Sequence, residues 1–233
     1  MSGIFYGVGV GPGDPELLTL KAIHTIQQAD VVIAPKTEKK ENSVALTIAT
    51  PYLKAGAKVV KLVFPMVSNT EQLTDAWLDN KNIILDLLQQ GKKVVFLTLG
   101  DPMFYSTYIY VFRLLKDAGY PIETLPGITA FCAIGSKLGY PIVEGDDVLN
   151  VIPATMADEK LEQVFASADN IVLMKVYKNF PQLLEKLKRH GFAKQAVMIS
   201  RCGLDDEQVV YNLSDLAPDH KLNYLSTIIA RRG

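Results

Sequence analysis

The sequence predicts an α/β protein with two domains. In the first part of the 233-residue chain, short apolar runs alternate with segments of helical periodicity, which is the pattern of a parallel, doubly wound sheet. Glycine-rich turns follow several of these runs, at the strand ends where such sheets bind ligands. The turn-forming stretch Ile142–Asp147 separates two sets of elements, so we place the domains at residues 1–144 and 145–233.

The first domain is expected to contain five strands and five helices. The strands are expected at Ile4–Val10, Val31–Ala34, Lys58–Phe64, Lys93–Leu99 and Ile122–Leu125. The helices are expected at Pro15–Gln28, Ser43–Leu53, Thr70–Gln90, Tyr105–Ala118 and Thr129–Leu138. In the first helix, Leu18, Ala22 and Ile26 recur at the spacing of a half-buried face. Pro51 should end or kink the second helix.

The second domain is expected to combine strands with two helices. Its strands are expected at Val148–Pro153, Asn170–Lys175, Ala196–Ser200, Val209–Asn212 and Tyr224–Arg231. Its helices are expected at Asp158–Ala168 and Asn179–His190. Hydrophobic residues make up 48% of the chain, which is enough to form a substantial core.

Composition argues against several classes of protein. The formal net charge of −1 disfavours a nucleic-acid binder that works by bulk electrostatics. The apolar segments are interrupted too often to span a membrane, and the start of the chain lacks a signal-peptide pattern. Cys132 and Cys202 form no C-x-x-C motif and are interpreted as reduced thiols of a cytoplasmic protein. The three histidines lie far apart in the sequence, so no metal site is expected.

The glycine-rich turn after the first strand is the most distinctive motif. Asp14 can accept hydrogen bonds from the amides of the following turn, and Pro15 suits a first helical position. A dinucleotide fingerprint fails here, because its sixth position falls on Pro12 or on Asp14, and a carboxylate would repel a pyrophosphate. A phosphate-binding loop fails too, because no Gly-Lys-Ser/Thr follows. A structural turn without a ligand is the alternative.

Two further turns of this kind follow later strands. Gly100-Asp101-Pro102 ends the fourth strand, and Pro126-Gly-Ile-Thr-Ala130 follows the fifth, with Thr129 placed to cap a helix. The aspartates favour a cation or an amine-bearing ligand over a phosphate chain. No G-x-S-x-G elbow is present, which disfavours nucleophilic hydrolysis.

Together these turns resemble the signatures of the tetrapyrrole methylases. The resemblance rests on the run from Gly7 to Ala22, on Gly100-Asp101-Pro102 and on Pro126–Ala130, and it extends over essentially the whole chain. The runs Leu97–Tyr108, Val172–Tyr177 and Tyr224–Ile228 resemble the branch that methylates C20 of precorrin-2 or cobalt-factor II in cobalamin biosynthesis. Leu99, Met103 and Tyr105 depart from the pattern of the uroporphyrinogen enzymes.

The resemblance implies two α/β domains with S-adenosylmethionine in a cleft between them and a tetrapyrrole trough in the first. It implies that S-adenosylhomocysteine is the product and that the protein is a homodimer. Carried over by motif, the cofactor-binding residues would be Pro12, Leu99, Gly100, Asp101, Phe104, Thr129, Ala130, Met174, Cys202, Gly203, Thr227 and Ile228. Candidates for holding substrate carboxylates are Lys36, Lys39, Lys40, Lys175, Arg201 and Arg231.

The resemblance assigns no catalytic residue. Asp101 is interpreted as a cofactor ligand, and Asp14 or a tyrosine of the trough is a candidate for the base that removes the C20 proton. Four alternatives remain open: methylation at another corrin position, a nicotinamide oxidoreductase, a tetrapyrrole carrier without catalysis, and methylation of a protein side chain. The broken dinucleotide fingerprint opposes the oxidoreductase, and three cofactor turns would be superfluous in a carrier.

Overall fold

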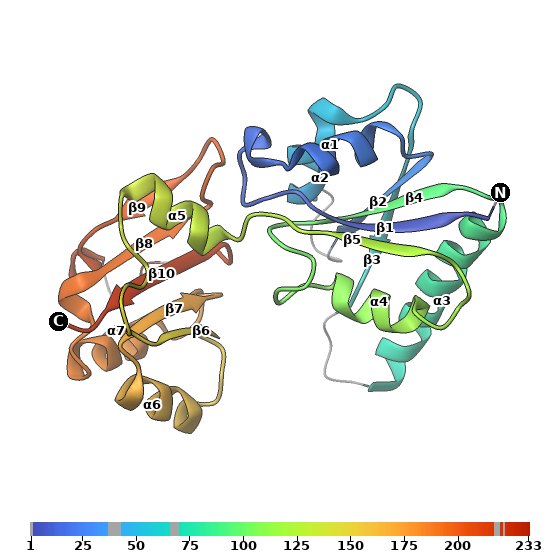
Figure 1. Cartoon of the computed structure of the whole chain (residues 1–233). Helices are drawn as coiled ribbons and strands as arrows, with labels where there is room; N and C mark the ends of the chain where they lie inside the picture. The colour runs from blue at the N-terminus through green and yellow to red at the C-terminus, as the bar shows by residue number, and fades with distance from the viewer. Residues whose placement is uncertain (1, 37–42, 66–69, 217–219, 221) are drawn as a thin grey trace. The chain divides into compact units, whose positions relative to one another are not determined.

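The computed structural model describes residues 2–36, 43–65, 70–216, 220 and 222–233. The chain divides into two compact units, residues 1–129 and 130–233. Each unit has its own sheet and its own helices (Figure 1). The prediction of two α/β domains is therefore confirmed.

The first unit is built on a parallel sheet whose strands run in the order β3-β2-β4-β1-β5. The strands are β1 (Ile4–Gly9), β2 (Val31–Lys36), β3 (Lys58–Val63), β4 (Lys93–Thr98) and β5 (Ile122–Leu125). Helices α1 (Leu20–Gln27) and α2 (Val44–Ala49) lie on one face of the sheet, and α3 (Thr70–Gln89) and α4 (Tyr108–Leu115) lie on the other (Figure 1). Because all five strands are parallel, their carboxyl ends share one edge.

One hydrophobic core of the first unit lies between the sheet and helices α3 and α4. Phe5, Phe96 and Tyr108 are fully buried there, with ring centroids about 6 Å apart. The Tyr108 ring lies over Gly7, where a Cβ would come within 2.1 Å of it, and its hydroxyl pairs with Oγ1 of Thr124 at 2.6 Å. Tyr108 therefore fixes α4 against β1 and β5.

The expected helix Pro15–Gln28 is divided in the structure. A 3-10 turn covers Pro15–Leu17, and its Asp14 cap accepts a hydrogen bond from the Glu16 amide at 2.8 Å. Leu18 is extended, and Thr19 then caps α1 by accepting from the Ala22 amide at 3.2 Å. The Asp14 cap was expected, whereas the second start at Thr19 was not. Helix α2 ends at Ala49 and is followed by a 3-10 turn at Thr50–Tyr52, so Pro51 ends the α-helix as expected.

The second unit has a mixed sheet in the order β6-β7-β10-β8-β9. The strands are β6 (Leu149–Pro153), β7 (Asn170–Met174), β8 (Ala196–Ser200), β9 (Gln208–Val210) and β10 (Ser226–Arg231). Strand β10 is antiparallel to both β7 and β8. Helix α5 (Ala130–Leu138) covers one face, and α6 (Asp158–Ser167) and α7 (Phe180–Arg189) cover the other (Figure 1).

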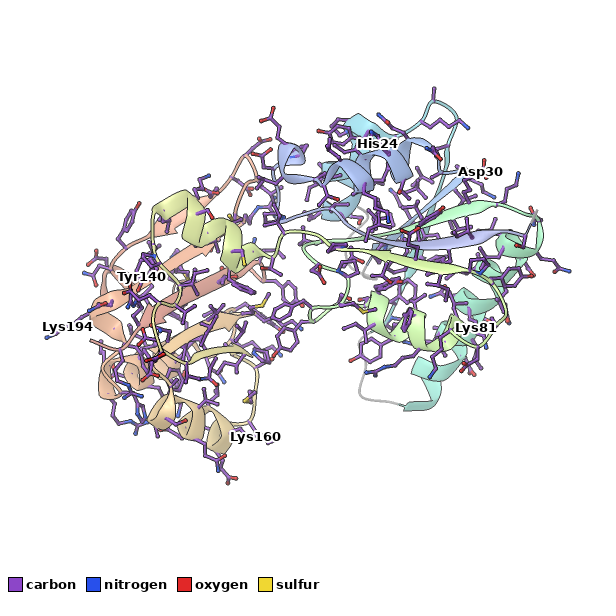
Figure 2. All side chains as sticks on the ribbon, viewed as in Figure 1. His24, Asp30, Lys81, Tyr140, Lys160 and Lys194 are labelled. Atoms are coloured by element: carbon purple, nitrogen blue, oxygen red, sulfur yellow. The ribbon has the colours of Figure 1, made fainter. Side chains whose placement is uncertain are left out.

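The division between the units falls earlier than the boundary expected after residue 144, because helix α5 packs on β10 of the second unit. The segment after α5 is tied to the same unit. The hydroxyl of Tyr140, labelled in Figure 2, donates to the Gln195 carbonyl at 2.8 Å. Arg231 donates to Glu144 at 2.6 Å. Among the described residues, no helix is long and apolar enough to cross a membrane.

Candidate functional site

The three glycine-containing turns of the first unit meet at the carboxyl edge of its sheet. The loop after β1 is joined to the turn after β4 by two backbone hydrogen bonds. The Val10 amide donates to the Thr98 carbonyl at 2.9 Å, and the Gly100 amide donates to the Gly11 carbonyl at 2.7 Å. From the sequence, each turn was expected to follow a strand, with the second turn on the same edge as the first. The structure places them side by side because β1 lies between β4 and β5.

The absence of side chains lets these backbones approach one another. A Cβ on Gly9 would lie 2.6 Å from the Gly100 carbonyl oxygen and 2.6 Å from the Gly127 amide nitrogen. A Cβ on Gly127 would lie 2.1 Å from the same carbonyl oxygen. These contacts are with backbone atoms, which have little freedom to move, so any larger residue would force the turns apart.

Asp101 joins the second turn to the third. Its Oδ2 accepts a hydrogen bond from the Gly127 amide at 3.0 Å, and its Oδ1 accepts one from the Met103 amide at 2.8 Å. Both carboxylate oxygens therefore hold backbone amides of the site. Such charge-assisted bonds are stronger than neutral ones, so this side chain fixes the shape of the edge.

Gly100 lies beside open space. Strand β4 ends at Thr98, and Gly100 has a φ of +71°, which L-residues with a side chain rarely adopt. A Cβ here would meet no heavy atom closer than the Ile128 carbonyl oxygen at 4.0 Å. Strand β4 thus ends one residue before the expected Leu99, and the chain has already turned at Gly100.

Thr129 supplies a hydroxyl at the same edge. It directly precedes α5, but its hydroxyl makes no capping hydrogen bond with the described residues, so the expected cap is not formed. Its Oγ1 is buried, yet it has no hydrogen-bond partner among the described residues. A buried hydroxyl without a partner is costly, so it is a candidate for contact with a bound molecule.

The remaining candidates of the first unit lie around these turns. Pro12 is buried beside Gly11, which bridges to Gly100. Leu99 and Phe104 are half-buried, and the Phe104 amide donates to the Asp101 carbonyl at 3.3 Å. Ala130 opens α5 and belongs to the second unit.

In the second unit, Met174 and Thr227 are directly opposite each other on β7 and β10. Met174 is half-buried, and Thr227 is buried. Ile228 is 0% exposed and packs in the core of this unit. Its side chain is therefore committed to the core, which the resemblance alone did not reveal.

Cys202 and Gly203 lie in the loop that follows β8. The Gly203 amide donates to Oε2 of Glu207 at 2.7 Å, and Lys137 of α5 pairs with the same carboxylate at 2.7 Å. Burial and then the charge of Glu207 raise the pKa of the Cys202 thiol to about 11. Glu207 and Lys137 were missed by the sequence reasoning, because the pair joins residues 70 positions apart.

The candidate basic residues lie in different parts of the fold. Arg231 pairs with Glu144 and Asp147, and Arg201 pairs with Asp206. Lys36 ends β2, and Lys175 directly follows β7. Lys39 and Lys40 lie outside the described residues. The structure therefore commits both arginines to carboxylates of their own unit.

The histidines lie on separate elements. His24, labelled in Figure 2, lies on α1, whereas His190 follows α7. In the part of the chain that the structure describes, no group of three His, Cys, Asp or Glu side chains is arranged to hold a metal ion.

The two-sheet α/β fold described above is shared with solved methyltransferase structures. The chain matches the profile of the Tetrapyrrole (Corrin/Porphyrin) Methylases over residues 5–217. It therefore belongs to the tetrapyrrole methylase family.

Individual members are similar over nearly their whole length. The probable cobalt-precorrin-2 C(20)-methyltransferase of Methanocaldococcus jannaschii is 35% identical over 97% of this chain and 95% of its own. The cobalt-precorrin-2 C(20)-methyltransferase of Salmonella typhimurium is 33% identical over 100% of this chain and 98% of its own. The structure of uroporphyrin-III C-methyltransferase from Thermus thermophilus, complexed with S-adenosyl homocysteine, has the same fold. Its TM-score is 0.70 at 22% identity, over 97% of this chain and 96% of that one.

Proposed function

We infer that this protein is an S-adenosylmethionine-dependent methyltransferase that methylates C20 of precorrin-2 or cobalt-factor II in cobalamin biosynthesis. The observation that carries this inference is the similarity, over nearly full length, to relatives named as C20-methyltransferases of cobalt-precorrin-2. The match is to whole proteins of the same size, so both units are included. The sequence runs around Gly100 and Tyr224 point to the same branch.

The turns of the first unit fit a bound S-adenosylmethionine. The open space beside Gly100 can accept part of a ligand, and the buried Thr129 hydroxyl lacks a partner among the described residues. We propose that Pro12, Leu99, Gly100, Asp101, Phe104 and Thr129 contribute from this unit. From the second unit we propose Ala130, Met174, Cys202, Gly203, Thr227 and the backbone of Ile228. When bound, the cofactor supplies an electrophilic methyl group on sulfur.

The main task of these residues is positioning. Holding two reacting atoms in line at ~3–3.5 Å lowers the activation barrier by roughly 7–11 kcal/mol. A rigid sheet edge that positions the cofactor is therefore more useful here than a strong acid or base. Asp101 contributes to that rigidity, because both of its oxygens hold backbone amides. We therefore assign it to shaping the cofactor site rather than to removing the C20 proton. The substrate carries several carboxylates, and Lys36 and Lys175 are the described lysines among the candidates to hold them.

Calorimetry separates this function from that of a nicotinamide enzyme. We expect S-adenosylhomocysteine to bind and NAD not to bind, because Asp14 and Asp101 lie where a pyrophosphate would need amides free of nearby carboxylates. Tight binding of NAD with no heat from S-adenosylhomocysteine would overturn the proposal.

We also propose a reducing, cytoplasmic location, which the free thiols Cys132 and Cys202 fit.

A further inference from the structure

The start of β10 and the ends of β7 and β8 share one edge of the second sheet. Thr227 is paired with Met174, the last residue of β7, and Ser226 is paired with Ser200, the last residue of β8. The Val176 amide donates to the Ser226 carbonyl, which extends this pairing beyond the strands. Three of the proposed cofactor residues, Met174, Cys202 and Thr227, therefore lie on or beside this edge.

Two tyrosines form an exposed aromatic pair at the same edge. The ring centroids of Tyr177 and Tyr224 are 5.2 Å apart, and the rings are tilted by 59°. Tyr177 is 36% exposed and Tyr224 is 47% exposed, so both retain surface for a further contact. They come from segments distant in sequence, which is why the spacing of the residues did not reveal the pair.

Positive charge accompanies this pair. Lys178 Nζ lies 5.4 Å from the centroid of the Tyr177 ring, within the range of a cation–π contact. Lys175 directly follows β7, two residues before Tyr177. Burial and then the neighbouring Tyr177 raise the pKa of the Tyr224 phenol, so Tyr224 stays uncharged at neutral pH. The pair therefore offers an uncharged aromatic surface with Lys178 beside it, and Lys175 lies nearby in the sequence.

The backbone that presents Tyr177 adopts an unusual conformation. Lys175 has a φ of +59° and Asn179 has a φ of +53°, both in the left-handed region that non-glycine residues rarely occupy. The Tyr177 amide donates to the Lys175 carbonyl at 2.9 Å, which closes a tight turn between them. Residues in such conformations cluster at functional sites.

We propose that Tyr177 and Tyr224 form a contact surface for the tetrapyrrole substrate, with the flanking lysines facing its carboxylates. The proposal rests on the proposed function. A large ring system with many carboxylates matches a surface that is both aromatic and cationic. The adenine of the cofactor lacks the negative charge that the lysines would complement. Aromatic side chains contribute much of the binding energy at such surfaces.

Three kinds of variant test this assignment. Tyr177→Ala and Tyr224→Ala each remove a ring, whereas Tyr177→Phe and Tyr224→Phe keep the ring and remove the hydroxyl. Tyr211→Ala is the matched control, because Tyr211 is 72% exposed in the same unit. Met198 pairs with Val210 and Ser200 pairs with Gln208, so Tyr211 lies toward the opposite end of β8. Each variant is measured for its KM for precorrin-2, its Kd for S-adenosylhomocysteine and its melting temperature.

We expect the alanine variants to raise KM for precorrin-2 about tenfold or more, the size typical of a lost aromatic contact. The Kd for S-adenosylhomocysteine and the melting temperature should stay near the wild-type values. The phenylalanine variants and Tyr211→Ala should behave like the wild type. An unchanged KM in both alanine variants would overturn the proposal. A weaker Kd for S-adenosylhomocysteine alone would also overturn it and would assign the pair to the cofactor. A lowered melting temperature that accounts for the raised KM would overturn it as well.

Failure of the proposed function gives a different result. In that case the wild type itself would transfer no methyl group to precorrin-2. Titration with uroporphyrin III, a stable polycarboxylated macrocycle, followed by its absorbance, then tests the pair independently of catalysis. Weaker uroporphyrin III binding in the alanine variants would still support the aromatic surface. Equal binding in all variants, or no binding by the wild type, would contradict it.

Discussion

At the scale of single residues, Gly100 combines a backbone conformation that disfavours a side chain with open space that could hold one. Its φ of +71° disfavours any residue with a side chain, whereas its surroundings leave room for one. A valine, which suits a strand, does not suit this position. A substitution that tests ligand contact must therefore tolerate the left-handed region, and asparagine does so better than most residues.

We predict that Gly100→Val destabilises the protein by about 1–3 kcal/mol, the cost of a bulky residue in a strained backbone region. Gly100→Asn should keep a near-native free energy of unfolding and lose affinity for S-adenosylhomocysteine, because its side chain would enter the open space. Denaturant unfolding and calorimetry on the same samples measure both effects.

Gly56→Asn is the matched control for this substitution. Gly56 has a φ of +80° and open surroundings, but it lies in an exposed turn before β3. The control should leave both unfolding and cofactor affinity unchanged. If the affinity of Gly100→Asn for S-adenosylhomocysteine equals that of the wild type, Gly100 does not contact the cofactor.

At the scale of elements, an ionic cluster joins α6 to α7. Lys186 is buried and pairs with Asp158 and Glu162, while His190 Nε2 lies 2.9 Å from Glu162. Arg189 pairs with the same carboxylate. The hydrogen bond from Lys186, and then that from His190, lower the pKa of Glu162 from 4.5 to about 2.

We predict that this cluster makes the protein less stable in acid. Because the folded state lowers the pKa of Glu162, its contribution is complete above the ordinary carboxyl pKa and disappears as the pH falls from 4.5 to about 2. Glu162→Gln should therefore melt below the wild type at neutral pH, and the difference should shrink over that interval. Thermal melts at a series of pH values measure it.

Glu185→Gln serves as the control, because the ion pair that Glu185 makes with Lys188 on α7 is exposed and is its only one among the described residues. Its melting temperature should follow that of the wild type at every pH. A constant difference between Glu162→Gln and the wild type down to pH 2 would show that Glu162 has an ordinary pKa.

Most elements could be predicted from the sequence, because strand and helix periodicity are local signals. The single helix expected at Pro15–Gln28 is divided in the structure, and the cause is also local. Leu18 becomes extended and Thr19 starts a second helix, and two successive caps are hard to distinguish from one. The structure divides the chain after residue 129 rather than after residue 144, since α5 packs on β10, a strand near the other end of the chain.

The candidate site was also predictable in part from the sequence. Its glycine turns carry sequence motifs, so the residues of all three turns were found. Their mutual contacts were not, because these depend on β1 lying between β4 and β5. The Glu207–Lys137 pair lies in no motif. Tyr177 and Tyr224 lie in runs that resemble the C20 branch, but their mutual contact was not predicted. Each pair joins segments that only the folded sheet brings together.

At the scale of the whole molecule, we propose that the protein is a homodimer, as the family resemblance implies. A stable dimer buries ~1,200–2,000 Å² or more, which an apolar content near one half can provide. Light scattering after size-exclusion chromatography at micromolar concentration should give twice the chain mass of 25.7 kDa. A mass equal to one chain would contradict the proposal.

The central claim is that the methyl group is transferred to C20, and the position of the new methyl group on the product tests it most directly. The protein is incubated with precorrin-2 and S-adenosylmethionine carrying a ¹³C-labelled methyl group, with and without cobalt. Mass spectrometry counts the methyl groups, and ¹³C NMR locates them. We predict one new methyl group, bonded to the meso carbon C20. A label on a pyrrole ring carbon, or no transfer from S-adenosylmethionine in either condition, would contradict the account.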